Sequence, residues 1–372
     1  MTPNSLALDF SQACLRGKLV DAFEHCHRLT HLNLSNNKLR GPRVLEAFKA
    51  LSSVGPQLVR LSLAGNALSG VFGGVNKVLN DEKRQYIDSK GPTEKCTMME
   101  LQKEGWTEEQ AQAGALRFAK KKKKDIQDRL SGKPTAGDDA GKKGKREPGV
   151  KSTTAEIFAM FSSLEVLALC HMDLEGVIHE NMGKHLTSLR QLWLNSNHIS
   201  EKLPESFSNL TQLELFDVSD NALDGPTLPH TIELLGGCRN RLRTLNLSGN
   251  PLGGELPEQL CGFTELSELK LNDMRLEGHI PSDLSRLARL KILFLFNNRL
   301  TGSIPASVTA LTELRELHLS NNQLVEPPIY SYSYASELYL QRKLPKCRVL
   351  GTDDLELAKI RRKNGYAVEP DS

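Results

Sequence analysis

The stretch that decides the fold reads Leu290-Lys-Ile-Leu-Phe-Leu-Phe-Asn-Asn-Arg-Leu300, and it is followed by Thr-Gly-Ser-Ile304-Pro305. It fits the frame L-x-x-L-x-L-x-x-N-x-L. Leucines at the fourth and sixth positions alternate with other residues, as in a short strand with one buried face. The asparagine at the ninth position has a short amide that can bond to the backbone of a sharp turn. The frame therefore predicts a strand, a turn and a return arc.

The same frame recurs along most of the chain. One copy cannot bury its own apolar edge, so neighbouring copies must stack before a core exists. Each inward leucine contributes roughly 1.5–3 kcal/mol when it is fully buried. Including a degenerate first copy, whose outer side is expected to face water as a cap, ten units begin at residues 5, 29, 58, 164, 189, 213, 242, 266, 290 and 314.

This frame is the signature of the leucine-rich repeat, and the ending L-x-G-x-[IL]-P at 252–257, 276–281 and 300–305 resembles the plant-type repeat class. The resemblance implies an α/β solenoid. Its expected architecture is a leucine-rich-repeat horseshoe of about ten repeats with a parallel β-sheet on the concave face. The plant-type class forms the ectodomains of receptor-like kinases and receptor-like proteins, which bind peptides, steroids or co-receptors along the inner surface.

The ninth position predicts a ladder of side-chain amides from repeat to repeat, because stacked copies align their turns. Met172 and Met274 interrupt that series and are interpreted as apolar substitutes. The framework leucines and phenylalanines are assigned to the core and given no functional role. The asparagines expected to form the ladder are Asn197, Asn221, Asn250, Asn298 and Asn322.

The chain divides into four predicted regions. Residues 1–72 hold an N-terminal capping repeat and the first repeats, 73–153 form an insert, 154–325 are the main array, and 326–372 are a C-terminal cap and tail. The last region is expected to contain a helix from Ala335 to Leu344, followed by Leu344-Pro-Lys-Cys347-Arg-Val-Leu350-Gly351. That segment resembles the cap of intracellular leucine-rich-repeat proteins, L-P-x-L-x-x-L-D, except that Cys347 replaces a leucine and Gly351 an aspartate.

The insert is basic, with 19 Lys and Arg against 13 Asp and Glu between Val75 and Thr153. A capping box at Thr107–Gln110 followed by an Ala-rich run predicts a helix to about Leu130, and the segment beyond it is expected to be disordered. A solvated linker, a nuclear import signal, and contact with nucleic acid or anionic lipid are the competing interpretations. No aromatic residues interleave the lysines, so base stacking has no support. The two basic clusters are Lys120, Lys121, Lys122, Lys123 and Lys124, and Lys142, Lys143, Lys145 and Arg146.

Composition indicates a soluble globular chain with a net charge of +3 and 39% hydrophobic residues. No run of about 18 apolar residues predicts a membrane span, and the first residues do not resemble a secretory signal. Seven cysteines suggest neither a disulfide nor a zinc framework, and His25, Cys26 and His27 are not expected to bind metal. We therefore expect a reducing, cytoplasmic and possibly nuclear location. The sequences Asn33-Leu-Ser, Asn209-Leu-Thr and Asn246-Leu-Ser are then expected to carry no glycan.

A partner surface is expected on the strands. Positions three, five and seven of each repeat alternate with the buried leucines and so lie on the concave face. Exposed aromatic residues among polar neighbours have the composition of interface hot spots. The alternative is that they are incidental surface aromatics. The candidate partner-binding residues are Trp193, Asp217, Asn246, Lys270, Phe294, Phe296 and His318.

No catalytic apparatus is evident. The chain has no Gly-rich phosphate loop, no G-x-S-x-G elbow and no metal-ligand spacing, so neither an enzyme nor a cofactor is expected. The leading hypothesis is a protein-interaction scaffold or signalling adaptor that binds a protein or peptide on the concave face. One alternative is a nuclear or nucleic-acid-associated factor that acts through the basic insert. Another is a receptor-like ligand-binding ectodomain.

Overall fold

The computed structural model describes residues 6–17, 23, 26–41, 44–68, 70–71, 154–225, 227–325, 340 and 343–350. All of them belong to one unit, which joins residues 1–78 to residues 154–372. The second unit, 79–153, lies outside the described residues. So do the helix predicted at 107–130, both lysine clusters, and most of the helix predicted at 335–344.

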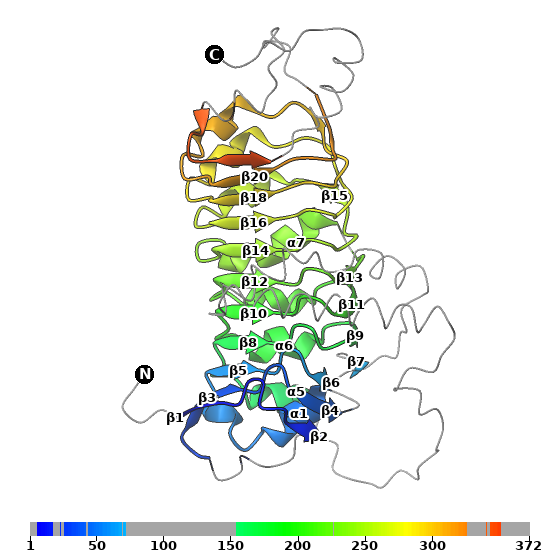
Figure 1. Cartoon of the computed structure of the whole chain (residues 1–372), viewed down its shortest axis with the longest axis vertical. Helices are drawn as coiled ribbons and strands as arrows, with labels where there is room; N and C mark the ends of the chain where they lie inside the picture. The colour runs from blue at the N-terminus through cyan, green and yellow to red at the C-terminus, as the bar shows by residue number, and fades with distance from the viewer. Residues whose placement is uncertain are drawn as a thin grey trace, which may run out of the picture. The chain divides into compact units, whose positions relative to one another are not determined.

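An 11-stranded, all-parallel sheet runs through the unit in sequence order (Figure 1). Ten of its strands are the predicted strands of the ten repeats, which confirms a leucine-rich-repeat solenoid with a parallel sheet. The eleventh comes from the cap segment. The strands are β1 (Leu6–Asp9), β3 (Leu29–Asn33), β5 (Arg60–Ser62), β8 (Val166–Ala168), β10 (Gln191–Trp193), β12 (Leu215–Asp217), β14 (Thr244–Asn246), β16 (Glu268–Lys270), β18 (Ile292–Phe294), β20 (Glu316–His318) and β22 (Arg348–Leu350).

The register keeps equivalent repeat positions side by side. Leu192 of β10 lies opposite Leu167 of β8 and Phe216 of β12. β5 pairs directly with β8, although about a hundred residues separate them in the sequence. The insert between them therefore interrupts the chain without interrupting the sheet.

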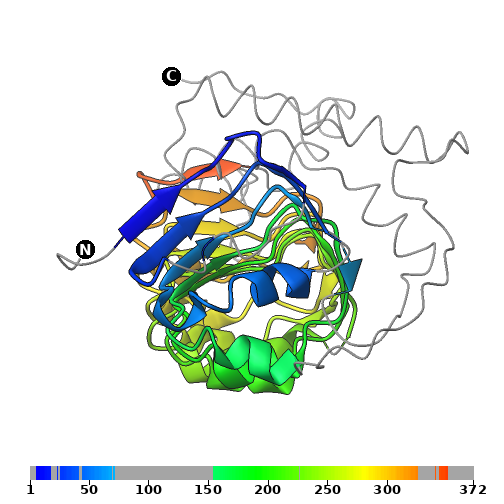
Figure 2. The same cartoon turned by 90° about the horizontal axis from the view of Figure 1, so that it is seen from below.

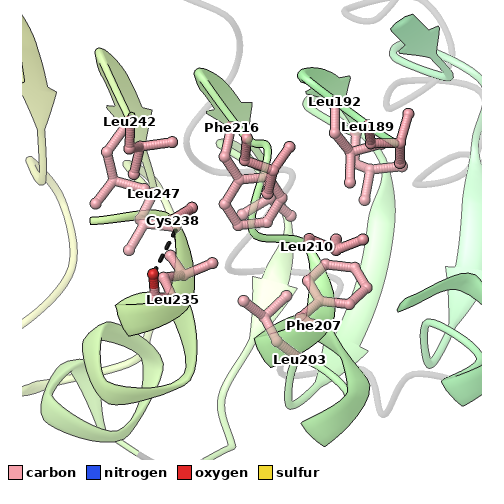
Figure 3. Close-up of a cluster of buried hydrophobic side chains, with 14 of the residues drawn as sticks. Leu189, Leu192, Leu203, Phe207, Leu210, Phe216, Leu235, Cys238, Leu242 and Leu247 are labelled. Atoms are coloured by element: carbon pink, nitrogen blue, oxygen red, sulfur yellow. Dashed lines mark hydrogen bonds between the residues drawn. The ribbon is translucent and has the colours of Figure 1, made fainter. Parts of the chain in front are cut away.

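The core fills the space between the large sheet and the return arcs (Figure 2). Leucines at the first, fourth and sixth positions of the frame interdigitate with apolar residues from the arcs. In the central repeats, Phe207 and Phe216 meet edge to face with ring centroids 5.9 Å apart, and they pack beside Leu189, Leu192 and Leu210 (Figure 3). The core is continuous because no repeat closes its own apolar edge.

The arcs contain short helical segments. Where the arc begins with proline, its fixed φ starts a single 3₁₀ turn, whereas the longer units at 29 and 213 have room for an α-helix. The α-helices are α1 (Val44–Ala50), α5 (Thr154–Ala159), α6 (Glu180–His185) and α7 (Leu228–Leu234). The 3₁₀ turns are η1 (Gly55–Gln57), η2 (Glu205–Asn209), η3 (Leu235–Cys238), η4 (Glu258–Gly262), η5 (Ser282–Arg286) and η6 (Ala306–Ala310).

Short parallel strands also form where the chain leaves each turn. They make one four-stranded, one three-stranded and two two-stranded sheets within the described residues. In the plant-type repeats these strands coincide with the L-x-G-x-[IL]-P ending. They are β7 (Gly70–Val71), β9 (Leu174–Gly176), β11 (His198–Glu201) and β13 (Ala222–Leu223); β15 (Gly254–Glu255) with β17 (Leu276–Glu277); β19 (Thr301–Gly302) with β21 (Gln323–Leu324); and β2 (Arg16–Gly17), β4 (Lys38–Gly41) and β6 (Ala67–Leu68).

The predicted asparagine ladder is present. Asn250 donates from Nδ2 to the carbonyl of Leu247 at 2.9 Å and to that of Val218 in the preceding repeat at 3.0 Å. Its Oδ1 accepts from the Leu223 N–H at 3.0 Å. Met172 and Met274 are fully buried, as expected of apolar substitutes. Each ladder amide thus satisfies backbone groups of two repeats at once.

A second conformational requirement lies one position earlier. The eighth residue of every repeat has a positive φ, between 52° and 72°. This left-handed region is costly for most residues and is tolerated best by Gly, Asn and Asp. Seven of the ten positions hold one of these three. The series is Gln12, Asn36, Gly65, His171, Ser196, Asp220, Gly249, Asp273, Asn297 and Asn321.

The glycine of the L-x-G-x-[IL]-P ending also has a positive φ, for example 75° at Gly278, whereas Glu201 occupies this position at 64°. We expect Glu201→Gly to raise the free energy of unfolding by about 0.5–1 kcal/mol. The substitution removes the cost of a left-handed conformation, which is about 1–2 kcal/mol for a residue with a Cβ. The extra backbone entropy that glycine loses on folding is smaller, about 0.5–1 kcal/mol. Urea denaturation measures the change. Gln323→Gly, in a strand with ordinary φ, is the control and should destabilise; a loss of stability at both positions would contradict the strain.

Both ends of the sheet carry atypical units. β1 follows the register expected of the degenerate first repeat, with Leu8 opposite Leu32. At the other end, the Leu344 N–H donates to the Leu340 carbonyl at 2.7 Å, a helical bond, and both side chains are buried. Cys347 is buried as well, where the resembling cap has a leucine. β22 then pairs with β20 and extends the sheet by one strand.

Candidate functional site

Positions three, five and seven of the repeats form the surface of the large sheet that faces away from the core, called here the strand face. In β10 and the residues after it, Leu192 and Leu194 are fully buried, whereas Gln191 and Trp193 are partly exposed. β8 shows the same alternation, whereas in β12 and β14 the fifth-position side chains are buried as well. The strand face is therefore a set of parallel side-chain columns that run across the sheet.

Trp193 lies in the central column, at position five. Its register neighbours are Ala168 of β8 and Asp217 of β12. Beyond Ala168 the column continues with Ser62 of β5. Ala168 and Ser62 on one side have short side chains, and the neighbour on the other side is an aspartate. The indole therefore has no large side chain next to it in the column. The partly exposed ring is thus available as an apolar contact on a rigid strand.

Asp217 and Asn246 make the middle of the column polar. The Asp217 Oδ1 accepts from the Ser219 N–H at 2.9 Å and from the Ser219 hydroxyl at 2.7 Å, and its Oδ2 accepts from the Asn246 amide at 2.9 Å. Burial raises the pKa of Asp217 above its ordinary value, against these hydrogen bonds and the positive charge of Lys270, which lower it. Neither side chain is exposed, although the sequence predicts both as partner-binding residues.

Four of the candidate residues form one cluster. The Phe294 ring lies 4.6 Å from the His318 ring and 6.0 Å from the Phe296 ring, centroid to centroid. The Lys270 Nζ lies 5.8 Å from the Phe294 centroid, over the ring, and 3.8 Å from the Glu268 carboxylate. A cation held over an aromatic face is attracted by the ring quadrupole. Lys270, Phe294, Phe296 and His318 are called here the aromatic cluster.

The prediction that Phe294 is an exposed aromatic is wrong. Only 8% of the residue is exposed, because Phe296, His318 and Lys270 surround its ring. Adjacent strands lie about 4.8 Å apart, so large neighbours in one column cover each other. Phe296 keeps more exposed surface than Phe294 and presents the aromatic cluster to solvent.

Three apolar residues on the strand face were not among the candidates. Val166, Leu215 and Ile292 occupy position three of their repeats and are partly exposed. Ile292 lies on the same strand as Phe294, two residues earlier, on the same side of the sheet. The frame itself contained this signal, because position three alternates with the buried fourth position. Ile292 therefore adds apolar surface beside the aromatic cluster, whereas Val166 and Leu215 lie on β8 and β12, on either side of β10, which carries Trp193.

The basic residues of the insert lie outside the described residues, and their roles stay predictions. Among the residues that the structure does describe, no group of three or more His, Cys, Asp or Glu side chains is placed to hold a metal ion. In the same part of the chain, no helix has both the length and the apolar character needed to cross a membrane.

The comparisons with known proteins agree with this geometry. Family models described as leucine-rich repeats match residues 28–51, 154–223, 241–263 and 288–328. Together with the parallel sheet, the asparagine ladder and the L-x-G-x-[IL]-P endings, these matches define a leucine-rich-repeat protein. Its repeats are of the plant type.

Individual relatives narrow the comparison. Over 116 residues the chain is 36% identical to Receptor-like protein 39 of Arabidopsis thaliana, an alignment that spans 31% of this chain and 12% of that protein. Among solved structures, a TDR receptor superposes with a TM-score of 0.59 at 19% identity, over 94% of this chain and 43% of that one. The Arabidopsis receptor kinase HAESA, solved with the peptide hormone IDA and the co-receptor SERK1, gives 0.58 at 21% identity, over 87% and 39%. At these identities the solved structures show the fold alone.

The prediction of a cytoplasmic or nuclear location is wrong. The curated relative is a receptor-like protein, which points to an extracellular or membrane-associated setting. The cysteine argument failed for a physical reason. Burial raises the pKa of Cys238 to about 12 and the pKa values of Cys261 and Cys347 to about 11. Such thiols act as small apolar groups in the core, so their being unpaired does not indicate a reducing compartment.

Proposed function

We propose that this chain is the ligand-binding array of a receptor-like protein and that it binds a protein or peptide through its strand face. The observation that carries the proposal is the placement of Trp193 and Phe296 on that face. Both are partly exposed, both lie on or directly after strands of a rigid sheet, and both have polar neighbours. Rigid aromatic side chains with these surroundings supply most of the energy in many protein interfaces.

The spacing of the two aromatic positions suggests the form of the ligand. Trp193 is the last residue of β10, and Phe296 lies two residues after the end of β18, four strands away in the sheet order. At about 4.8 Å per strand, the two positions are separated by about 19 Å along the sheet. An extended peptide rises about 3.3 Å per residue, so about six residues span this distance. The proposed ligand is an extended segment with an apolar side chain near each end.

The surface between the anchors is suited to polar groups. The Ser248 hydroxyl donates to the Asn272 amide oxygen at 2.7 Å, which places hydroxyl and amide groups next to each other in the seventh-position column. Lys270 supplies a positive charge beside this column. Peptide N–H and C=O groups need such partners when an extended segment is desolvated on a sheet. The middle of the strand face therefore matches the backbone of the ligand more than its side chains.

Binding is tested by capture from native extracellular and membrane extracts, followed by quantitative mass spectrometry. The double variant Trp193→Ala/Phe296→Ala is compared with the wild type. We expect the partner's recovery to fall by at least tenfold, because truncating a hot-spot aromatic costs about 1–2 kcal/mol or more. Both substitutions leave the buried leucines intact, so the double variant should show the circular dichroism spectrum of the wild type.

A matched control uses an exposed apolar residue away from the strand face. Met160 follows α5 on the arc side and is 38% exposed. Met160→Ala should leave the partner's recovery unchanged. A partner list that is the same for all variants, or one that changes only with Met160→Ala, would reject the strand face as the binding surface.

A further inference from the structure

Three N-x-S/T sequences lie in very different environments. Asn33 and Asn246 belong to the strand lettering L-N-L-S and fall on the strand face, in β3 and β14. Asn209 lies at the end of η2, on the return arc. Because a glycan attached to asparagine must project into solvent, the folded structure distinguishes among the three.

The two strand asparagines are engaged in the sheet surface. The Asn246 amide donates to Asp217 at 2.9 Å and to the Ser219 hydroxyl at 3.1 Å, and its oxygen accepts from the Ser248 N–H at 3.2 Å. Asn246 is also buried. The Asn33 oxygen accepts from the Ser35 N–H at 3.0 Å and from the Ser35 hydroxyl at 2.7 Å, and its amide donates to Asp9. In both sequences the serine donates a hydrogen bond to the asparagine of the same acceptor sequence. A glycan on Asn246 would not fit, because this side chain is buried among its neighbours in the column.

Asn209 has none of these constraints. Its side chain is exposed and makes no hydrogen bond within the described residues, and Thr211 is exposed too. Leu210 between them is buried and fixes the segment on the core. The Asn209 carbonyl accepts from the Thr211 N–H at 2.9 Å, so the two residues share one tight turn. An amide presented at such a turn points into solvent.

The arc position equivalent to Asn209 is also open to solvent in other repeats. Gly262, Arg286 and Ala310 are the residues that end η4, η5 and η6, as Asn209 ends η2. Arg286 and Ala310 are exposed, and a Cβ added at Gly262 meets no heavy atom within 4 Å. A substituent at this position therefore leaves the stacking of repeats unaffected.

We propose that Asn209 is the attachment site of an N-linked glycan; this rests on the extracellular setting of the proposed function. The Asn209 Nδ2 attacks the anomeric carbon of an oligosaccharide carried on a lipid diphosphate. The new C–N bond forms as the bond between the anomeric carbon and the diphosphate oxygen breaks. The diphosphate leaves with the bonding electrons, and the amide nitrogen gives up one proton. The threonine two residues on completes the acceptor sequence.

The position of this glycan has a structural consequence. η2 lies on the arc, whereas the proposed ligand surface is the opposite side of the large sheet (Figure 2). A hydrated glycan on Asn209 covers arc surface and leaves Trp193 and the aromatic cluster uncovered. We infer that the glycan restricts association to the strand face.

The full chain is expressed with an appended signal sequence in insect cells, and glycan occupancy is read by peptide mass spectrometry and by the mobility shift on glycosidase treatment. We expect a glycan on Asn209 and none on Asn33 or Asn246. Asn209→Gln should remove the shift. Asn209→Gln/Ala310→Asn should restore it, because Leu311 and Thr312 complete a new acceptor in the equivalent column.

Secreted, folded protein without a glycan on Asn209, or with one on Asn246, would overturn this assignment. Neither result bears on ligand binding, because Asn209→Gln is expected to retain the captured partner. Conversely, an unchanged partner list for the Trp193→Ala/Phe296→Ala variant would reject the binding proposal and leave glycan occupancy unaffected.

Discussion

Replacing Asn221 with alanine is expected to lower the free energy of unfolding by about 3 kcal/mol. The Asn221 amide donates to the carbonyls of Leu194 and Val218, both at 3.0 Å, and its oxygen accepts from the Ile199 N–H at 2.9 Å. The residue is fully buried, so water cannot replace these bonds. Each buried backbone group left without a partner costs about 1–3 kcal/mol. Several such groups belong to two different repeats, and the loss therefore loosens the stacking as well as the turn.

Urea denaturation followed by circular dichroism measures this loss, with unchanged m-values as evidence that the unfolding reaction is the same. Met172→Leu is the matched control, because Met172 occupies the ninth position of its repeat with an apolar side chain and is fully buried. A volume-conserving exchange there should cost less than about 1.5 kcal/mol. Equal losses at the two positions would mean that the amide ladder contributes no more than apolar filling.

The second large effect is expected from Phe216→Ala, with a loss of about 4 kcal/mol in the free energy of unfolding. Phe216 is fully buried at the fourth position of its repeat, and its ring meets Phe207 edge to face (Figure 3). Truncating a core phenylalanine removes its transfer free energy and leaves a cavity, which together cost about 3–5 kcal/mol. The cavity would lie where the sheet and η2 meet, so neighbouring repeats would lose contact too.

Phe296→Ala provides the comparison for this prediction. It removes the same side chain from the strand face, where Phe296 is partly exposed and contacts Phe294 and His318 without sealing the core. We expect a loss of about 1 kcal/mol, mainly from the aromatic contacts. Comparable losses for the two variants would contradict the assignment of position four to the core and position seven to the open surface.

The sequence predicts the large sheet well because its frame repeats the same physical requirement in every unit. Leu192 and its equivalents must be buried, and Asn250 and its equivalents must satisfy the backbone of two repeats. The register follows from aligning these positions. Even the degenerate first unit was recognised, since Leu8 retains the spacing. β22 was not predicted as a strand, because the cap sequence lacks the frame.

Other features depended on neighbours that one repeat does not reveal. The burial of Phe294 results from Lys270 and His318 on adjacent strands, and that of Asp217 from Asn246. The left-handed eighth position was overlooked, although residues such as Asp220 and Gly249 before the ladder asparagines carried the signal. The predicted location rested partly on the cysteines, several of which are buried in the core and act there as small apolar groups.

Footprinting with hydroxyl radicals, in the presence and absence of the captured partner, tests the central claim most directly. The reagent oxidises accessible side chains, so it compares the two sides of the sheet in one experiment. The strand-face proposal predicts that oxidation of Trp193, Phe296 and His318 falls on binding while oxidation of the exposed arc residue Met160 does not change. Protection of Met160 together with unchanged oxidation of Trp193 and Phe296 would contradict it.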